Sequence, residues 1–197
     1  HLWHVGATLY DLQDLWRDTD SGHNVTRTVF VECGSSYFSH GPEHLRSVGE
    51  TTYVAERAAA SRKDAAKATI AAIVAKADLC HPALDEILDA HEKAGQGLFR
   101  GIRDAGAHAH HPDALSIPGR ADPDLYANAA FRQGVQRLGE RGLTYDTWHY
   151  HYQNQAFCDL ASAVPDTVMV LDHFGTPLGI GPYAGQREEI FEEWKSD

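Results

Sequence analysis

The sequence has few cysteines and no long apolar run, and these two absences exclude several classes of protein. Its three cysteines, Cys33, Cys80 and Cys158, are far apart and have no CxxC spacing, which excludes a disulfide framework and a thiolate zinc site. No segment approaches the roughly 18 apolar residues that span a bilayer, and the first residues do not resemble a signal peptide. We therefore expect a soluble, cytoplasmic protein that does not act at a membrane.

Basic residues are also scarce. The 197 residues include 17 Lys plus Arg against 28 Asp plus Glu, which gives a formal net charge of -11. A charge of this sign disfavours a protein that grips nucleic acid or an anionic membrane. Because 43% of the residues are hydrophobic and 23% are charged, the composition is that of a globular protein. We expect a single domain over residues 1–197, with a small molecule as its partner.

Segments rich in β-branched and aromatic residues alternate with segments that suit helices. The expected strands are 25–33, 69–76, 98–103, 143–149 and 167–173. The expected helices are 54–68, 82–95, 124–141, 156–164 and 186–195, with a long loop over 104–123. This alternation predicts an α/β fold with a parallel sheet covered by helices. No glycine-rich phosphate loop follows the first of these strands, which disfavours a nucleotide-binding fold.

Polar side chains stand at the carboxyl ends of several of these strands, where a (β/α)8 barrel keeps its active site. They are Glu32, Arg103, His149, His151, Asp172 and His173. Asp172 and His173 end the most apolar strand, and a histidine there could bind a metal or move a proton near neutral pH. The alternative is a histidine that caps or packs, bonded to the backbone. We predict that this pair is catalytic.

His149 and His151 share one face of an extended segment, and such a pair can chelate a metal. Alternatively, only one of them faces the site and the other belongs to the loop. Arg103 offers a planar fork that suits a substrate carboxylate or lactone oxygen, or else it forms an ion pair with an acidic neighbour. Glu32 could be a polar contact in the same cavity. We predict that Arg103, Glu32 and His149 bind the substrate, which is expected to carry a carboxylate.

The histidines of the long loop and Cys33 are of residue types that could form a site, but we do not predict one there. His108, His110 and His111 lie in the long loop with Ala and Pro, where a solvated surface is the better interpretation. Cys33 follows an apolar strand, but no neighbouring base supports a nucleophile, and a buried cysteine packs as a small hydrophobe.

Four segments together resemble the amidohydrolase-2 family, the metal-dependent hydrolases of the amidohydrolase superfamily. The segments are Val-Phe-Val-Glu-Cys-Gly at 29–34, Phe-Arg-Gly-Ile-Arg at 99–103, Tyr-Asp-Thr-Trp-His-Tyr-His at 145–151 and Val-Leu-Asp-His-Phe-Gly-Thr-Pro-Leu-Gly at 170–179. The opening His-Leu-Trp at 1–3 resembles the end of that family's D-x-H-x-H-L-W motif. The resemblance covers nearly the whole chain and implies a (β/α)8 barrel.

The resemblance also implies roles for individual residues. His1 and His151 would be ligands of one divalent metal ion, Zn or Mn, with His173 polarising the attacking water and Arg103 placing the substrate. A bound cation would lower the pKa of its water and polarise the scissile carbonyl. The first histidine of the opening motif and the late aspartate of the family are missing. With 1–3 counted as a strand there are about six βα units rather than eight, so we expect a barrel truncated at both ends.

The resulting hypothesis is a metal-dependent hydrolase that opens a small-molecule lactone, ester or amide. One alternative is a non-oxidative decarboxylase on the same scaffold, and another is a catalytically incomplete fragment or binding module. Because an open sheet leaves unpaired edges, association into a homo-oligomer is also expected.

Overall fold

The structure is a computed structural model that describes residues 1–5 and 8–197. Its residues group into two compact units, 1–103 and 104–197. Whether the two units fold as the single domain expected from the chain length stays a prediction.

The first unit begins with an antiparallel hairpin and continues with a parallel sheet. Strand β1 (Trp3–Val5) pairs with β2 (Thr8–Tyr10), and helix α1 (Leu12–Thr19) follows them. Parallel strands then stand in the order β3-β4-β5. Their bounds are Arg27–Val31 for β3, Thr69–Ala75 for β4 and Phe99–Arg103 for β5. The expectation that 1–3 is a remnant of the first barrel strand is wrong, because Trp3 belongs to β1, which pairs with β2 in a separate two-stranded sheet, and His1 and Leu2 lie outside any strand.

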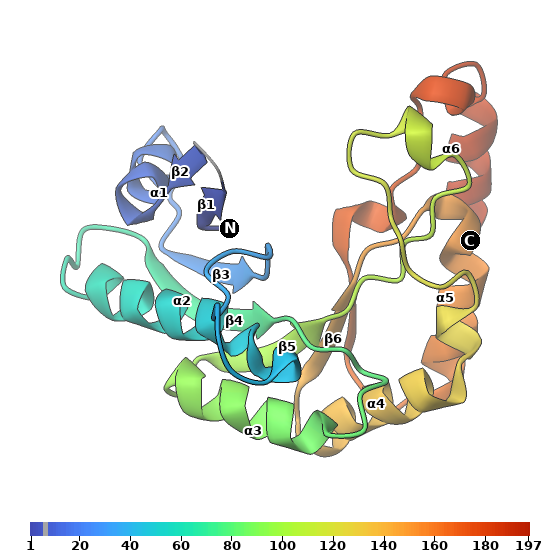
Figure 1. Cartoon of the computed structure of the whole chain (residues 1–197). Coiled ribbons are helices and arrows are strands. Elements are labelled where there is room, and N and C mark those ends of the chain that lie inside the picture. Colours follow the sequence, from blue (N-terminus) through green and yellow to red (C-terminus); the bar gives the residue numbers. More distant parts are fainter. Residues whose placement is uncertain (6–7) are drawn as a thin grey trace. The chain divides into compact units, whose positions relative to one another are not determined.

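Two helices cover one face of this sheet, as Figure 1 shows. Helix α2 (Val48–Ser61) packs on β4 and on α3 (Leu84–Gly95), and α3 packs on β5. The apolar side chains Val54, Ile73 and Leu88 are completely or almost completely buried between these layers. Helix α2 begins six residues earlier than the alanine-rich stretch predicted, and this early start places Glu50 in its first turn.

The second unit repeats the alternation of helix and strand. Parallel strands β6 (Thr144–Thr147) and β7 (Met169–Leu171) are paired in register. The helices are α4 (Ala129–Glu140), α5 (Asn154–Ala163) and α6 (Arg187–Ser196). Its buried side chains include Phe131, Val135 and Tyr145, which are each 0% exposed. The parallel α/β class predicted from the sequence is therefore confirmed, with elements close to the expected bounds.

Other features of the chain agree with its composition. The three cysteines are free thiols, as their spacing predicted. Among the described residues, no helix combines the length and the apolar character that crossing a bilayer requires.

Candidate active site

The carboxyl ends of β3 and β5 are joined by a salt bridge between two predicted site residues. Arg103 donates from Nε to Glu32 Oε1 at 2.9 Å and from its Nη2 to the Glu32 carbonyl at 2.6 Å. The two side chains are only 10% and 15% exposed. Both were predicted to bind substrate, and the structure shows the alternative that the sequence left open, an ion pair. A direct substrate contact by either residue stays a prediction.

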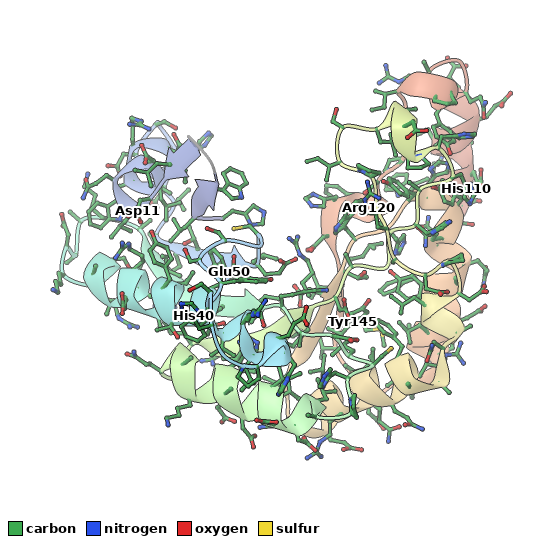
Figure 2. All side chains as sticks on the ribbon, in the orientation of Figure 1. Asp11, His40, Glu50, His110, Arg120 and Tyr145 are labelled. Atoms are coloured by element: carbon green, nitrogen blue, oxygen red, sulfur yellow. The ribbon has the colours of Figure 1, made fainter. Side chains whose placement is uncertain are left out.

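A buried carboxyl that the sequence reasoning missed lies beside this pair. Glu50 is 2% exposed, and its Oε1 accepts hydrogen bonds from the backbone N–H of Ser35 at 2.7 Å and of Cys33 at 3.2 Å. Burial raises the pKa of Glu50, while these two donors act in the opposite direction. Figure 2 labels Glu50 in the first unit, where it reaches the segment that follows β3. Near neutral pH this carboxyl is therefore better able to hold a proton than an exposed glutamate.

Close packing at the start of α2 puts Glu50 there. A Cβ on Gly49 would lie 2.6 Å from the Phe38 nitrogen and 2.6 Å from the Ser36 oxygen, so only glycine allows this approach. The pattern Ser47-x-x-Glu50 is the sequence signature of a capping box, and it could have signalled both the helix start and the glutamate. In the structure the Glu50 side chain accepts hydrogen bonds from the segment that follows β3 and does not cap the helix.

Cys33 is held as a thiol in this environment. Its Sγ lies 3.5 Å from Glu50 Oε1 and 3.5 Å from the Leu2 carbonyl. Burial, and then the nearby Glu50 carboxylate, raise the pKa of Cys33 to about 12. A thiol with this pKa is a poor nucleophile at neutral pH, which agrees with its interpretation as a packing residue.

The second unit buries His149 in a network of neutral hydrogen bonds. Its Nδ1 lies 2.9 Å from the Tyr126 hydroxyl and its Nε2 lies 3.0 Å from Asn154 Oδ1. The ring is 0% exposed, and burial lowers its pKa. Tyr126 in turn lies 2.9 Å from the Thr147 hydroxyl. Since both ring nitrogens are engaged, the predicted contact between His149 and a substrate would require one of these bonds to break.

His151 is buried among aromatic rings two residues further on. Its Nδ1 accepts from the Leu178 N–H at 3.4 Å, and the rings of Tyr152 and Tyr183 lie 5.1 and 6.0 Å away. Burial lowers the pKa of His151. An Nδ1 that accepts keeps the proton of the neutral ring on Nε2, whereas a ligand histidine that binds through Nε2 carries its proton on Nδ1. This tautomer does not suit a metal bound through Nε2.

Asp172 and His173 follow β7 in a short helical turn, η5 (Asp172–Gly175), with unusual backbone geometry. His173, Phe174, Gly175 and Thr176 all have positive φ, between 42° and 65°. His173 is exposed, and its ring packs edge-on against Trp148 at 6.5 Å. Non-glycine residues in this region carry strain, which is typical of functional loops. The catalytic role predicted for Asp172 and His173 is consistent with this placement and stays a prediction.

The loop that contains the other histidines is partly packed. His108 is half-buried and its Nδ1 lies 2.9 Å from the Ala121 carbonyl. His110 and His111 are exposed, and His110 stacks on Tyr152 with ring centroids 4.0 Å apart. The interpretation as a solvated loop fits the exposed His110 and His111, whereas His108 is partly buried.

The described residues do not form a site for the metal ion that the resemblance implies. No three His, Cys, Asp or Glu side chains gather there in a group that could hold a metal ion. His1, the other predicted ligand, is exposed, and its Nδ1 donates to the Val31 carbonyl at 2.6 Å. This bond leaves its Nε2 available, but a single histidine is not a metal site. The residues that are described therefore do not fit the ion.

The chain was compared with protein families and with curated proteins. No family model matches the chain. A curated relative, the uncharacterized protein y4mH of Sinorhizobium fredii, is 32% identical over 123 residues, which are 62% of this chain and 37% of that protein. The chain thus spans little more than a third of the relative that it matches.

Solved structures resemble the chain along nearly all its length. A crystal structure of an amidohydrolase from Burkholderia multivorans with bound zinc matches with a TM-score of 0.66 at 20% identity, over 96% of this chain and 54% of that one. A second structure of an amidohydrolase from that organism, with bound HEPES, matches with a TM-score of 0.64 at 21% identity. The likeness shows the fold. The chain has the α/β fold of about half an amidohydrolase barrel, which confirms the expected barrel type, with five described parallel strands in place of the expected six.

Proposed function

We propose that the protein is a hydrolase of the amidohydrolase type that cleaves a lactone, ester or amide in a small carboxylated molecule. The observation that carries this proposal is the likeness to the zinc-bound amidohydrolase over 96% of the chain. Polar residues follow the carboxyl ends of β3, β5 and β7, which is where such barrels perform chemistry. The zinc belongs to the related protein. The described residues of this chain do not form a site for such an ion, so we assign proton transfer to a side chain of the chain itself.

Within the first unit, Glu50 is the group that we assign to proton transfer. Hydrolysis requires a group that takes a proton from water or gives one to the leaving oxygen or nitrogen, and such a group works best with a pKa near the working pH. Burial raises the pKa of Glu50 in that direction. The Arg103–Glu32 ion pair is the fixed element beside it, and its role is to hold the ends of β3 and β5 in place.

A panel of lactones, esters and amides tests the proposal, with each substrate assayed with added zinc or manganese and with a chelator. We expect release of a carboxylic acid from at least one lactone. Glu50→Gln keeps an oxygen that accepts from the two backbone N–H groups, and it should lower kcat at least 100-fold and flatten the pH profile. Glu56→Gln, an exposed site on the same helix, is the matched control and should leave kcat unchanged. Equal rates for the two variants would contradict the role of Glu50.

Two other functions give different outcomes in this assay. Release of CO2 without a ring-opened acid would identify the decarboxylase of the same scaffold. The binding module is favoured by one observation, the lack of a three-donor metal group in the described part of the chain. It predicts binding without turnover under every metal condition.

A further inference from the structure

A cavity in the first unit lies outside the Glu32–Arg103 pair. It has a volume of about 550 Å3 and is lined by Lys76 and Ala77, which directly follow β4, and by Ser47 and Ile87, which belong to the starts of α2 and α3. In open parallel α/β sheets, ligands bind beyond the carboxyl ends of the strands. The position of this cavity is therefore that of a ligand site.

Two stacked histidines form one wall of the cavity. The rings of His44 and His81 are 4.8 Å apart and 18° from parallel, although they come from different segments. His81 Nδ1 accepts from the Ala83 N–H at 3.1 Å, so the neutral ring carries its proton on Nε2. His44 Nε2 lies 3.3 Å from Glu86 Oε2. His81 therefore offers an N–H donor that its stacking partner holds in position.

Two cationic side chains also line this cavity. Arg46 makes no side-chain hydrogen bond or ion pair with any residue in the described ranges, so its five N–H donors are available to a ligand. A guanidinium fork matches the two oxygens of a carboxylate or a phosphate. The second cation is Lys76, whose carbonyl oxygen lies 3.0 Å from Nε2 of the buried His91. This bond fixes the backbone of Lys76 at the cavity.

Both neighbouring helices direct their N-termini to this region. Ser47 precedes α2, and its hydroxyl turns to His91 Nε2 at 3.4 Å instead of capping the first turn. Ala83 precedes α3 and has no side chain that could cap it. The N–H groups of Gly49, Glu50 and Leu84 donate to the carbonyls of Arg46, Ser47 and His81, so it is the dipole of each helix that adds partial positive charge to that of Arg46 and Lys76. Glu43 and Asp78 also line the cavity, and their carboxylates can accept hydrogen bonds from hydroxyl groups of a ligand. The site therefore suits a small anion that also carries hydroxyl groups.

We propose that this cavity binds the oxyanion group, carboxylate or phosphate, of a small polar molecule, with the Arg46 guanidinium and the His81 N–H as donors. In the proposed hydrolase this group is the carboxylate of the substrate, an assignment that rests on the proposed function. It gives that carboxylate a receptor other than Arg103, whose fork is engaged by Glu32. The binding itself is independent of turnover.

Titration of the full chain with sodium succinate and, separately, with sodium phosphate at constant ionic strength tests the proposal by NMR. We expect saturable shifts confined to the backbone amides of 44–49, 76–78 and 81–87, which line the cavity. Arg46→Gln should weaken binding at least tenfold. Arg62→Gln removes the same charge from an exposed arginine at the other end of α2 and should leave binding unchanged. His81→Asn keeps a side-chain oxygen that can accept from Ala83 but removes the ring donor, and it should weaken binding severalfold.

The outcomes separate this proposal from the proposed function. Binding of succinate alone assigns the site to carboxylates, binding of phosphate alone assigns it to phosphates, and either result supports an oxyanion site even if no lactone is hydrolysed. Shifts that do not saturate, shifts outside these segments, or equal weakening by Arg46→Gln and Arg62→Gln would overturn it. Melting temperatures of the variants within about 2 °C of the parent identify a loss of binding that is not a loss of fold.

Discussion

The two units hold their polar strand-end residues in different ways. In the first unit Arg103 and Glu32 form a salt bridge with little exposure, and Glu50 is surrounded by N–H donors. In the second unit His149 and His151 are buried as neutral rings that bond to uncharged partners. A charged pair is stable only while both partners are present, whereas a neutral ring tolerates burial as long as it stays unprotonated. The strand-end residues of the first unit are thus sensitive to loss of charge, and those of the second unit are sensitive to gain of a proton.

The largest expected loss of stability follows from breaking the salt bridge of the first unit. Glu32→Leu leaves Arg103 buried without its counter-charge and should lower the free energy of unfolding by about 3 kcal/mol. Replacing both residues by Leu should recover most of this loss, because a hydrophobic pair of similar volume is often neutral. Urea unfolding followed by circular dichroism measures both values. A double variant as unstable as the sum of the two single variants would show that the residues are not coupled.

The matching change in the second unit removes the neutral network. His149→Phe leaves the Tyr126 hydroxyl and Asn154 Oδ1 without their ring partner and should cost about 2 kcal/mol of unfolding free energy. Tyr126→Phe removes one bond and should cost about 1 kcal/mol. The same urea experiment reports both. An unchanged midpoint for His149→Phe would mean that this histidine is not held for stability.

The first unit also contains a buried histidine, His91, whose protonation is tested by the pH dependence of stability. Burial lowers the pKa of His91 from 6.5 to about 4, so between these values the folded state binds fewer protons than the unfolded state. Stability therefore falls as the pH falls from 6.5 to about 4, with a slope of at most about 1.4 kcal/mol per pH unit. His91→Gln should remove this part of the slope and leave the part contributed by His149. Identical slopes for parent and variant would contradict a protonation cost at His91.

The smallest expected effect concerns strain in the second unit. Thr176 has a φ of 42°, and its buried hydroxyl has no hydrogen-bond partner among the described residues. Thr176→Gly should raise the unfolding free energy by about 1 kcal/mol, because glycine adopts positive φ without strain. Thr176→Ser keeps the hydroxyl and the strain and should gain less. If the glycine variant is less stable than the parent, the strain is not stored at this residue.

The sequence predicted the alternation of strands and helices because apolar periodicity reflects burial, and each strand ends near the expected residue. It also identified Glu32 and Arg103, but it left open whether they bind each other or a substrate, since pairing across β3 and β5 depends on strand order. The start of α2 was not predicted, because the alanine content indicates a helix only from Val54, whereas the Ser47-x-x-Glu50 pattern marks its true start.

Features that arise from tertiary packing were not predictable from local pattern. The partners of His149 come from Tyr126 and Asn154, and nothing in the sequence near the histidine identifies the tyrosine. The four consecutive positive φ angles at 173–176 include one glycine, so composition gave no sign of the other three. The cavity at Arg46 and His81 likewise joins segments more than thirty residues apart.

Hydrolysis in water enriched in 18O tests the central claim most directly. The substrate is the lactone that the panel identifies, and mass spectrometry of the product follows the label. We expect the ring-opened acid to carry a single 18O atom in its new carboxylate, because water attacks the carbonyl carbon and the ring oxygen leaves as a hydroxyl. Product without the label, release of CO2, or no turnover with zinc or manganese present would contradict a hydrolase.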